Sequence, residues 1–165
     1  MPSPRVGIAP EAARRQELSL LGLVFLATFS VGLNATMMNV ALPSVSADLG
    51  ATATQSSWTL LVYGLVSTGL LIPFGHLADV VDRRRLFLSA VVLTTVGGVV
   101  VAAAPTPWLL VGGRGIQAVG GAVLLTNAAV ILAGVFPGAR LGRAMGVYLA
   151  GFSTGHVVGP VVAGV

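Results

Sequence analysis

Cysteine and lysine are absent from this sequence, and charged residues of either sign are scarce. Charged side chains make up 8% of the 165 residues and hydrophobic ones 55%, whereas an ordinary soluble domain has about 25% charged residues. Nine basic and five acidic side chains are too few to cover a soluble globule of this length. The composition therefore indicates an integral membrane protein, and the lack of cysteine excludes a disulfide scaffold and a thiolate metal site.

Signals of catalysis and of nucleic-acid binding are missing as well. The sequence has no phosphate-binding glycine loop, no HExxH metal motif, no nucleophile elbow and no pair of acids inside an apolar run. The formal net charge is +4, but the longest basic run is only Arg83–Arg85. We therefore expect no enzyme activity, no cofactor, no metal site and no nucleic-acid partner.

Five long apolar runs dominate the chain. A helix needs roughly 20 apolar residues to cross a bilayer core of about 30 Å. Runs of this kind predict transmembrane helices at about residues 18–43, 57–74, 86–104, 108–136 and 144–165. The 22 glycines suit helices that approach one another closely. The predicted fold class is all-α and integral to the membrane.

Arginine placement predicts how these helices are oriented. Arginines precede the first run and lie in the connections after the second and fourth runs, whereas the other two connections contain none. The positive-inside rule then makes residues 1–17 a cytoplasmic tail of a multi-pass protein in the cell inner or plasma membrane. The first run is too long for a signal peptide, so we expect it to stay uncleaved. The chain stops at Val165 inside apolar sequence, which we interpret as truncation.

The connection between the second and third runs reads GHLADVVDRRR and begins at Gly75. We expect Gly75 to end the helix, and Asp79 to pair with an arginine or to face the positive end of a helix. The alternative is an ordinary cytoplasmic loop with an incidental acid, in which Arg83, Arg84 and Arg85 only set the orientation.

Asn34 and Arg114 are polar residues inside apolar runs. Arginine within a span costs about 2.5–3.5 kcal/mol on insertion scales, which makes Arg114 a functional candidate; the alternative is that it snorkels to the interface. Counting from the outer helix ends at 1.5 Å per residue places Asn34 roughly 13 Å deep and Arg114 at a similar level. Arg114 is then expected to bond the Asn34 side-chain carbonyl. Gln117 lies one helical turn further along.

The fifth run contains a ladder of glycines. Gly151, Gly155 and Gly159 recur every four residues and leave a smooth face for a neighbouring backbone. Pro160 removes one backbone donor and is expected to bend the helix. His156 is a candidate proton carrier, with a hydrogen-bonded packing role as the alternative.

In chain order, these segments resemble motifs of the major facilitator superfamily. The connection with Gly75, Asp79 and the three arginines resembles its cytoplasmic latch loop, although Asp82 stands where the family has glycine. Residues 32–43, GLNATMMNVALP, resemble a motif of the fourteen-helix drug:proton antiporter branch. Asn34 replaces the aspartate of that motif, so the proton-carrying role of the carboxylate does not transfer to this chain.

Two further resemblances concern the fourth and fifth runs. Arg114 and Gln117 match a motif whose arginine lines the central cavity and is tied to proton transfer. Gly155, Gly159, Pro160 and Gly164 match the antiporter motif that is typical of exporters. The family's substrate or coupling cavity would then include Asn34, Arg114, Gln117 and His156.

The resemblance implies the first five helices of the N-terminal bundle of a major facilitator fold. The function implied is proton-coupled efflux of drugs or amphipathic small molecules, with the lipid bilayer, a small-molecule substrate and protons as partners. The C-terminal helices or a membrane partner would be missing, so we expect no transport by residues 1–165 alone. The alternatives are a non-transporting five-helix protein that packs against a partner, and a decayed gene product that folds poorly.

Overall fold

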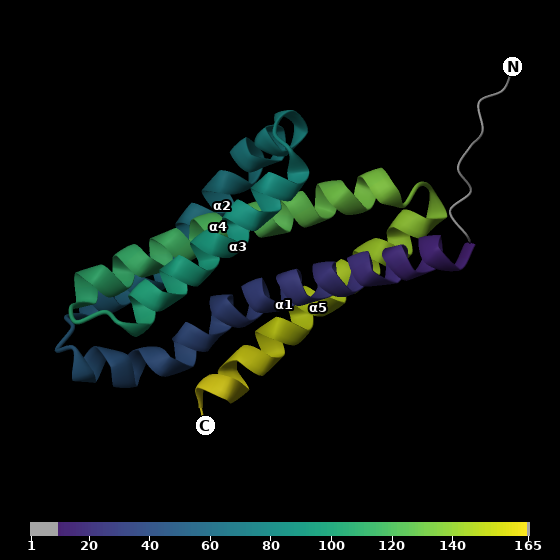
Figure 1. The fold of residues 1–165 in the computed structure, drawn as a ribbon. Coiled ribbons are helices and arrows are strands. Elements are labelled where there is room, and N and C mark those ends of the chain that lie inside the picture. The colour runs from purple at the N-terminus through teal and green to yellow at the C-terminus, as the bar shows by residue number, and fades with distance from the viewer. Residues whose placement is uncertain (1–9, 165) are drawn as a thin grey trace, which may run out of the picture.

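The computed structural model describes residues 10–164, apart from the side chains of Pro10, Ala13 and Asp79. It shows five helices in this part of the chain (Figure 1): α1 Pro10–Asp48, α2 Ala53–Val80, α3 Arg83–Ala102, α4 Pro107–Val135 and α5 Ala139–Ala163. Each is long and apolar enough to cross a membrane. The first nine residues of the predicted cytoplasmic tail and Val165 lie outside the described residues.

Helix α4 is the centre of the bundle. It packs against all four other helices, most extensively against α2 and α3. Its small residues allow this: Gly113, Gly120 and Gly121 are buried, and Ala118 and Ala122 have no exposed surface. A Cβ atom on Gly120 would lie 2.7 Å from the Thr94 backbone nitrogen of α3. The backbones of α3 and α4 can therefore approach only because position 120 has no side chain.

Helices α1 and α5 form a second close pair, which Figure 1 shows side by side along most of their length. The glycine ladder of α5 faces α1: a Cβ atom on Gly155 would lie 2.8 Å from the Leu33 backbone nitrogen, and one on Gly159 2.9 Å from the Leu33 carbonyl oxygen. We call this contact the α1–α5 seam. The predicted smooth helix face does meet a neighbouring backbone.

The helices extend further than the apolar runs predict. Gly75 was expected to end the second helix, but α2 continues through it to Val80. The end comes where Val81 turns extended, with its N–H donating to the Leu77 carbonyl at 3.0 Å. Likewise α1 continues past Pro43 to Asp48. Polar residues can extend a transmembrane helix beyond its hydrophobic stretch, so hydropathy alone does not mark the helix end.

Side-chain caps close the short turns. Thr52 and Gln55 form a reciprocal capping box at the start of α2. Asp82 accepts a hydrogen bond from the Arg85 backbone N–H at 2.8 Å and so caps α3. The acid at position 82, where the resembling motif has glycine, therefore fits this turn, because its carboxylate satisfies a free N–H group at the helix start.

Candidate functional site: a polar cluster between α1 and α4

A polar cluster joins α1 to α4 near the middle of the bundle. The Arg114 guanidinium donates from Nη1 to the Asn34 backbone oxygen at 3.1 Å and to Gln117 Oε1 at 3.0 Å. Gln117 Nε2 in turn donates to Asn34 Oδ1 at 3.2 Å, and Asn34 Nδ2 donates to the Ser30 carbonyl at 2.9 Å. The structure therefore confirms that Asn34 and Arg114 lie at one level.

One detail of the cluster differs from the expectation. Arg114 bonds the backbone oxygen of Asn34, whereas the side-chain oxygen of Asn34 is taken by Gln117. Gln117 stands one helical turn after Arg114, so both side chains leave the same face of α4. The glutamine can then bond the arginine with its carbonyl and the asparagine with its amide group.

Arg114 is also held by an aromatic ring. Its guanidinium carbon lies 4.2 Å from the centre of the Tyr63 ring of α2, a distance typical of a cation–π contact. Only 2% of Arg114 is exposed, so the side chain does not snorkel out of this bundle. A desolvated cation–π contact is worth about 2 kcal/mol, which offsets much of the cost of an arginine within a span.

The donors of Arg114 are not all used. Its Nε atom is buried and has no hydrogen-bond partner within the described part of the chain. The partners that Nη1 does have, an amide side chain and a backbone carbonyl, are neutral. A buried cation is normally paired with a carboxylate, so this site is unusual in holding a guanidinium with neutral groups and a ring.

Two hollows meet at the polar cluster. One, of about 500 Å³, is lined by Asn34, Arg114 and Gln117 together with apolar residues such as Met37 and Met38. The second, of about 460 Å³, extends toward the other end of α1 and is lined by Asn34 and Gln117 but not by Arg114. The Asn34–Gln117 hydrogen bond lies between the hollows and borders both.

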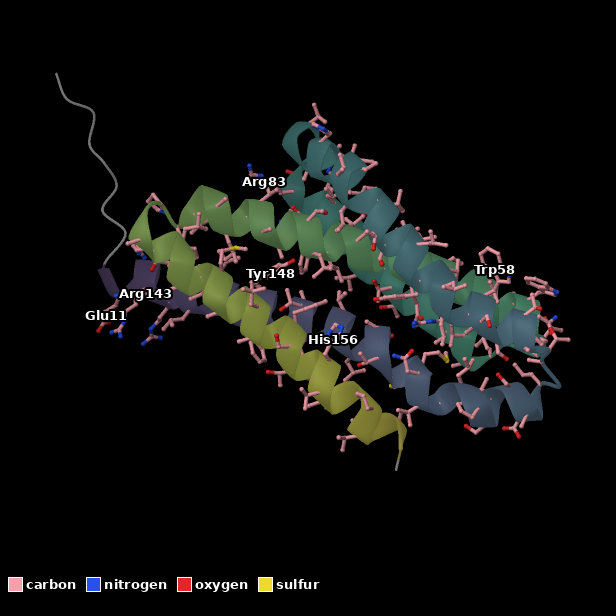
Figure 2. All side chains as sticks on the ribbon, turned by 180° about the vertical axis from the view of Figure 1, so that it is seen from behind. Glu11, Trp58, Arg83, Arg143, Tyr148 and His156 are labelled. Carbon is pink, nitrogen blue, oxygen red and sulfur yellow. The ribbon has the colours of Figure 1, made fainter. Side chains whose placement is uncertain are left out.

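His156 lies apart from this cluster, although the sequence grouped it with the cavity residues. Figure 2 shows it on α5, where the helix runs against α1. Its Nδ1 is 3.1 Å from the Phe152 carbonyl, and its ring centre is 4.3 Å from that of Phe152. Gly32 makes room for it, since a Cβ atom there would be 3.0 Å from Nδ1. His156 therefore belongs to the seam and does not line the hollows.

The latch-like segment lies at the turn between α2 and α3. The side chain of Asp79 falls outside the described residues. Arg84 and Arg85 are exposed, and the Arg83 carbonyl accepts a hydrogen bond from Asn127 Nδ2 of α4 at 2.9 Å. Asn127 has no exposed surface, so it ties the start of α3 to the bundle from within.

The last motif residues serve different parts of α5. Gly155 and Gly159 lie in the seam, whereas Gly164 follows the helix end and donates its N–H to the Pro160 carbonyl at 3.1 Å. Pro160 sits inside the helix, which continues to Ala163.

Sequence reasoning missed Tyr63 and Asn127. Tyr63 carries no polar neighbour in sequence, and its position over Arg114 depends on how α2 crosses α4. Asn127 follows Arg114 by 13 residues in the same apolar run. An uncharged amide inside a predicted span is a signal that could have been followed, because buried amides in membranes usually bond another helix.

Figure 2 shows the charged end of the bundle, with Glu11 and Arg143 near one another and Trp58 toward the opposite end. At the charged end Arg140 of α5 forms an ion pair with Glu17 of α1. Both side chains are partly solvent-exposed, so the pair contributes little to stability, about 0–1 kcal/mol.

These features define a class of protein, the helical membrane proteins with a polar site between their helices. The sequence matches the Major Facilitator Superfamily over residues 24–165, and the chain belongs to this superfamily. A solved bacterial homolog of the human lysosomal transporter Spinster superposes with a TM-score of 0.71, covering 95% of this chain and 32% of that one. At 23% identity this likeness shows the fold. The predicted fold, five helices of a major facilitator bundle, is confirmed.

Several curated proteins are similar in sequence. The chain is 36% identical over 146 residues to the puromycin resistance protein pur8 of Streptomyces alboniger, covering 87% of this chain and 29% of that protein. It is 33% identical over 155 residues to a probable actinorhodin transporter of Streptomyces coelicolor, with coverages of 94% and 26%. For the riboflavin transporter RibZ of Clostridioides difficile the identity is 28% over 151 residues, with coverages of 92% and 33%. The chain thus spans a third or less of the length of these relatives.

Proposed function

We propose that this chain forms the N-terminal helices of a drug exporter of the fourteen-helix drug:proton antiporter branch, which moves amphipathic small molecules out of the cell. The observation that carries the proposal is the convergence of Asn34, Arg114 and Gln117 on a hollow whose other walls are largely apolar. Small-molecule sites are typically clefts of roughly 300–1,000 Å³ with a few polar groups. Met37 and Met38 add a lining that adapts to varied shapes.

The names of similar proteins support export. Besides the puromycin resistance protein, the chain is 32% identical over 145 residues to a multidrug efflux pump, LfrA of Mycolicibacterium smegmatis. In transporters built from repeats, substrate sites lie near the midplane between the two halves. Five helices cannot enclose such a site from both sides, so on this proposal the activity requires further helices.

The proposed orientation places the N-terminus in the cytoplasm. Apart from Arg114 within α4, the arginines of the described residues cluster at the start of α1, at the α2–α3 turn and at the α4–α5 turn, whereas the α1–α2 and α3–α4 turns have none. This distribution follows the positive-inside rule for a cell membrane. The turn with Arg83, Arg84 and Arg85 would then act as a cytoplasmic latch toward the second half of the transporter.

Proton coupling on this proposal does not run through position 34. An amide does not titrate, so Asn34 cannot take up and release a proton as the aspartate of the antiporter motif would. The exporter is then either uncoupled at this site or coupled through a carboxylate elsewhere. Replacing Asn34→Asp in the protein as its gene encodes it should make efflux more dependent on the proton gradient. Unchanged proton dependence would count against this part of the proposal.

Efflux from a host strain that lacks its own drug exporters tests the main proposal. Cells that express the protein as its gene encodes it are loaded with ethidium, puromycin or riboflavin and then energised. We expect faster efflux of at least one compound than from cells with the empty vector, and the same rate for Gly146→Ala, because a Cβ atom at Gly146 meets open space. Arg114→Gln should lose this efflux.

Residues 1–165 alone are the second arm of this experiment. We expect them to insert but not to transport. Efflux by this segment would overturn the claim that more helices are needed. If the protein accumulates stably and moves none of the three compounds, the export proposal fails, and co-purification with a membrane partner would then favour the packing-only alternative.

A further inference from the structure

The most unusual group in the described bundle is the Arg114 guanidinium, because none of the carboxylates that the structure describes lies beside it. The chain has five acids, and all of them lie near helix ends: Glu11, Glu17, Asp48, Asp79 and Asp82. Asp48 lines the outer end of the same hollow as Arg114. It is 14 residues from Asn34, which is roughly 20 Å along a helix.

Three observations bear on which further partner Arg114 could bind. Arg114 is 2% exposed and its Nε has no partner in the described residues. The neutral groups around it, Asn34 and Gln117, bond only Nη1 and bond each other. The side chain also lines a hollow of about 500 Å³, so there is room beside it for a ligand.

We propose that Arg114 is the binding site for a carboxylate group that this chain does not itself provide. A guanidinium presents its N–H donors in a planar fork that matches a carboxylate, and such charge-assisted bonds are about twice as strong as neutral ones. The apolar walls of the hollow, including Met38 and Leu110, suit a carboxylate borne on an apolar body. This inference rests on the proposed export function, and where the carboxylate is borne by the solute it adds amphipathic acids to the substrates of the exporter.

The carboxylate has two possible sources. It is either part of the transported solute or an acidic side chain from a helix outside residues 1–165. Either source would bring a carboxylate group to Arg114. A solute carboxylate can be added to the purified protein or left out, whereas a protein carboxylate is always present.

Thermal unfolding of the purified protein, as its gene encodes it, separates the sources without any transport assay. The probe is sodium benzoate, compared with benzamide plus an equal concentration of sodium chloride. The variants are Asn34→Asp, which places a carboxylate beside Arg114, and Asn39→Asp, which adds the same charge to an exposed position of α1. Arg114→Gln, if it folds, should remove any benzoate effect.

If the carboxylate belongs to a solute, benzoate raises the unfolding temperature of the native protein in a saturable way and benzamide does not. Asn34→Asp is then more stable than Asn39→Asp without ligand and no longer responds to benzoate. If the carboxylate belongs to the protein, benzoate has no effect and Asn34→Asp is less stable than Asn39→Asp, because two acids crowd one guanidinium.

Two results would overturn the inference. One is an Asn34→Asp variant that is as stable as Asn39→Asp, or more stable, together with no benzoate effect, because Arg114 would then have had no anionic partner. The other is a benzoate effect that Asn34→Asp retains, which would place the bound anion elsewhere. Neither result bears on efflux itself, so failure of this inference is distinguishable from failure of the export proposal.

Discussion

Helix α1 uses two of its faces in opposite ways. Toward α5 it meets Gly151, Gly155 and Gly159, and the two backbones touch because side chains are missing. Toward α4 it meets Arg114 and Gln117, whose side chains donate hydrogen bonds to the backbone oxygen and the side-chain oxygen of Asn34. The seam is therefore defined by shape and the cluster by polarity, although both stabilise the same helix.

This difference teaches which changes each interface tolerates. At the seam even one added carbon forces the helices apart, whatever its polarity. At the cluster the volume is less constrained, since hollows adjoin it, but each polar group depends on the others for its partner. The glycines of the seam therefore act by leaving space for a neighbouring backbone, whereas the polar residues of the cluster act by supplying one another with hydrogen-bond partners.

The largest effect is expected at the seam. Gly155→Leu places a side chain against the Leu33 backbone and should lower the free energy of unfolding by about 3 kcal/mol or more, as overpacking of a tight contact does. The readout is the unfolding temperature in detergent. Gly146→Leu is the matched control on the same helix, where a Cβ atom meets open space. Equal losses in both variants would show that α1 and α5 are not in close contact.

A smaller loss is expected where Tyr63 covers Arg114. Tyr63→Leu removes the cation–π contact and should cost about 2 kcal/mol, the value for a desolvated pair. Tyr63→Phe keeps the ring and removes only the 3.4 Å hydrogen bond to the Val31 carbonyl, so it should stay close to the native protein. If both variants lose the same stability, the hydroxyl and not the ring supports this region.

The cap of α3 lies in neither the seam nor the polar cluster and so tests a stabilising contact away from α1. Asp82→Ala removes the side-chain acceptor for the Arg85 N–H and should cost about 1 kcal/mol, whereas Asp82→Gly should cost only a few tenths of that. Chemical unfolding of the two variants measures the difference. A larger loss for glycine than for alanine would mean that the carboxylate does not act as a cap.

The smallest effect tests a polar contact within the seam. The Thr36 hydroxyl lies 3.1 Å from the His156 carbonyl across the two helices. Thr36→Val should cost about 0.6 kcal/mol, the average for interhelical hydrogen bonds in membranes. Thr95→Val is the control, because that hydroxyl bonds its own helix at the Val91 carbonyl. If Thr36→Val lost more stability than Gly155→Leu, polar contacts and not close packing would be the main stabilising feature of the seam.

Much of the fold could be predicted from the sequence. The apolar runs gave five helices, and the glycine spacing in α5 gave a face for close packing. The positions of the helix ends were harder to predict. Helix α2 continues past Gly75 because polar residues extend it beyond its apolar part. Hydropathy reports where a chain prefers lipid, not where backbone hydrogen bonds stop.

The site could be predicted only in part. Depth counting brought Asn34 and Arg114 to one level, because rise per residue is fixed. Depth counting could not predict that Tyr63 lies over Arg114 or that His156 faces α1 in the seam. Both placements depend on how each helix is rotated about its own axis. Asn127 was overlooked because an amide in an apolar run carries no charge to draw attention to it.

The most direct test of the account is whether α1 turns Asn34 toward α4. The chain has no native cysteine, so the pair Asn34→Cys and Gln117→Cys can be linked in membranes by a short bifunctional thiol reagent without background. The account predicts efficient linking of this pair and little linking of Asn39→Cys with Gln117→Cys, because Asn39 faces outward. Equal linking of both pairs, or linking only through position 39, would contradict the polar cluster between α1 and α4.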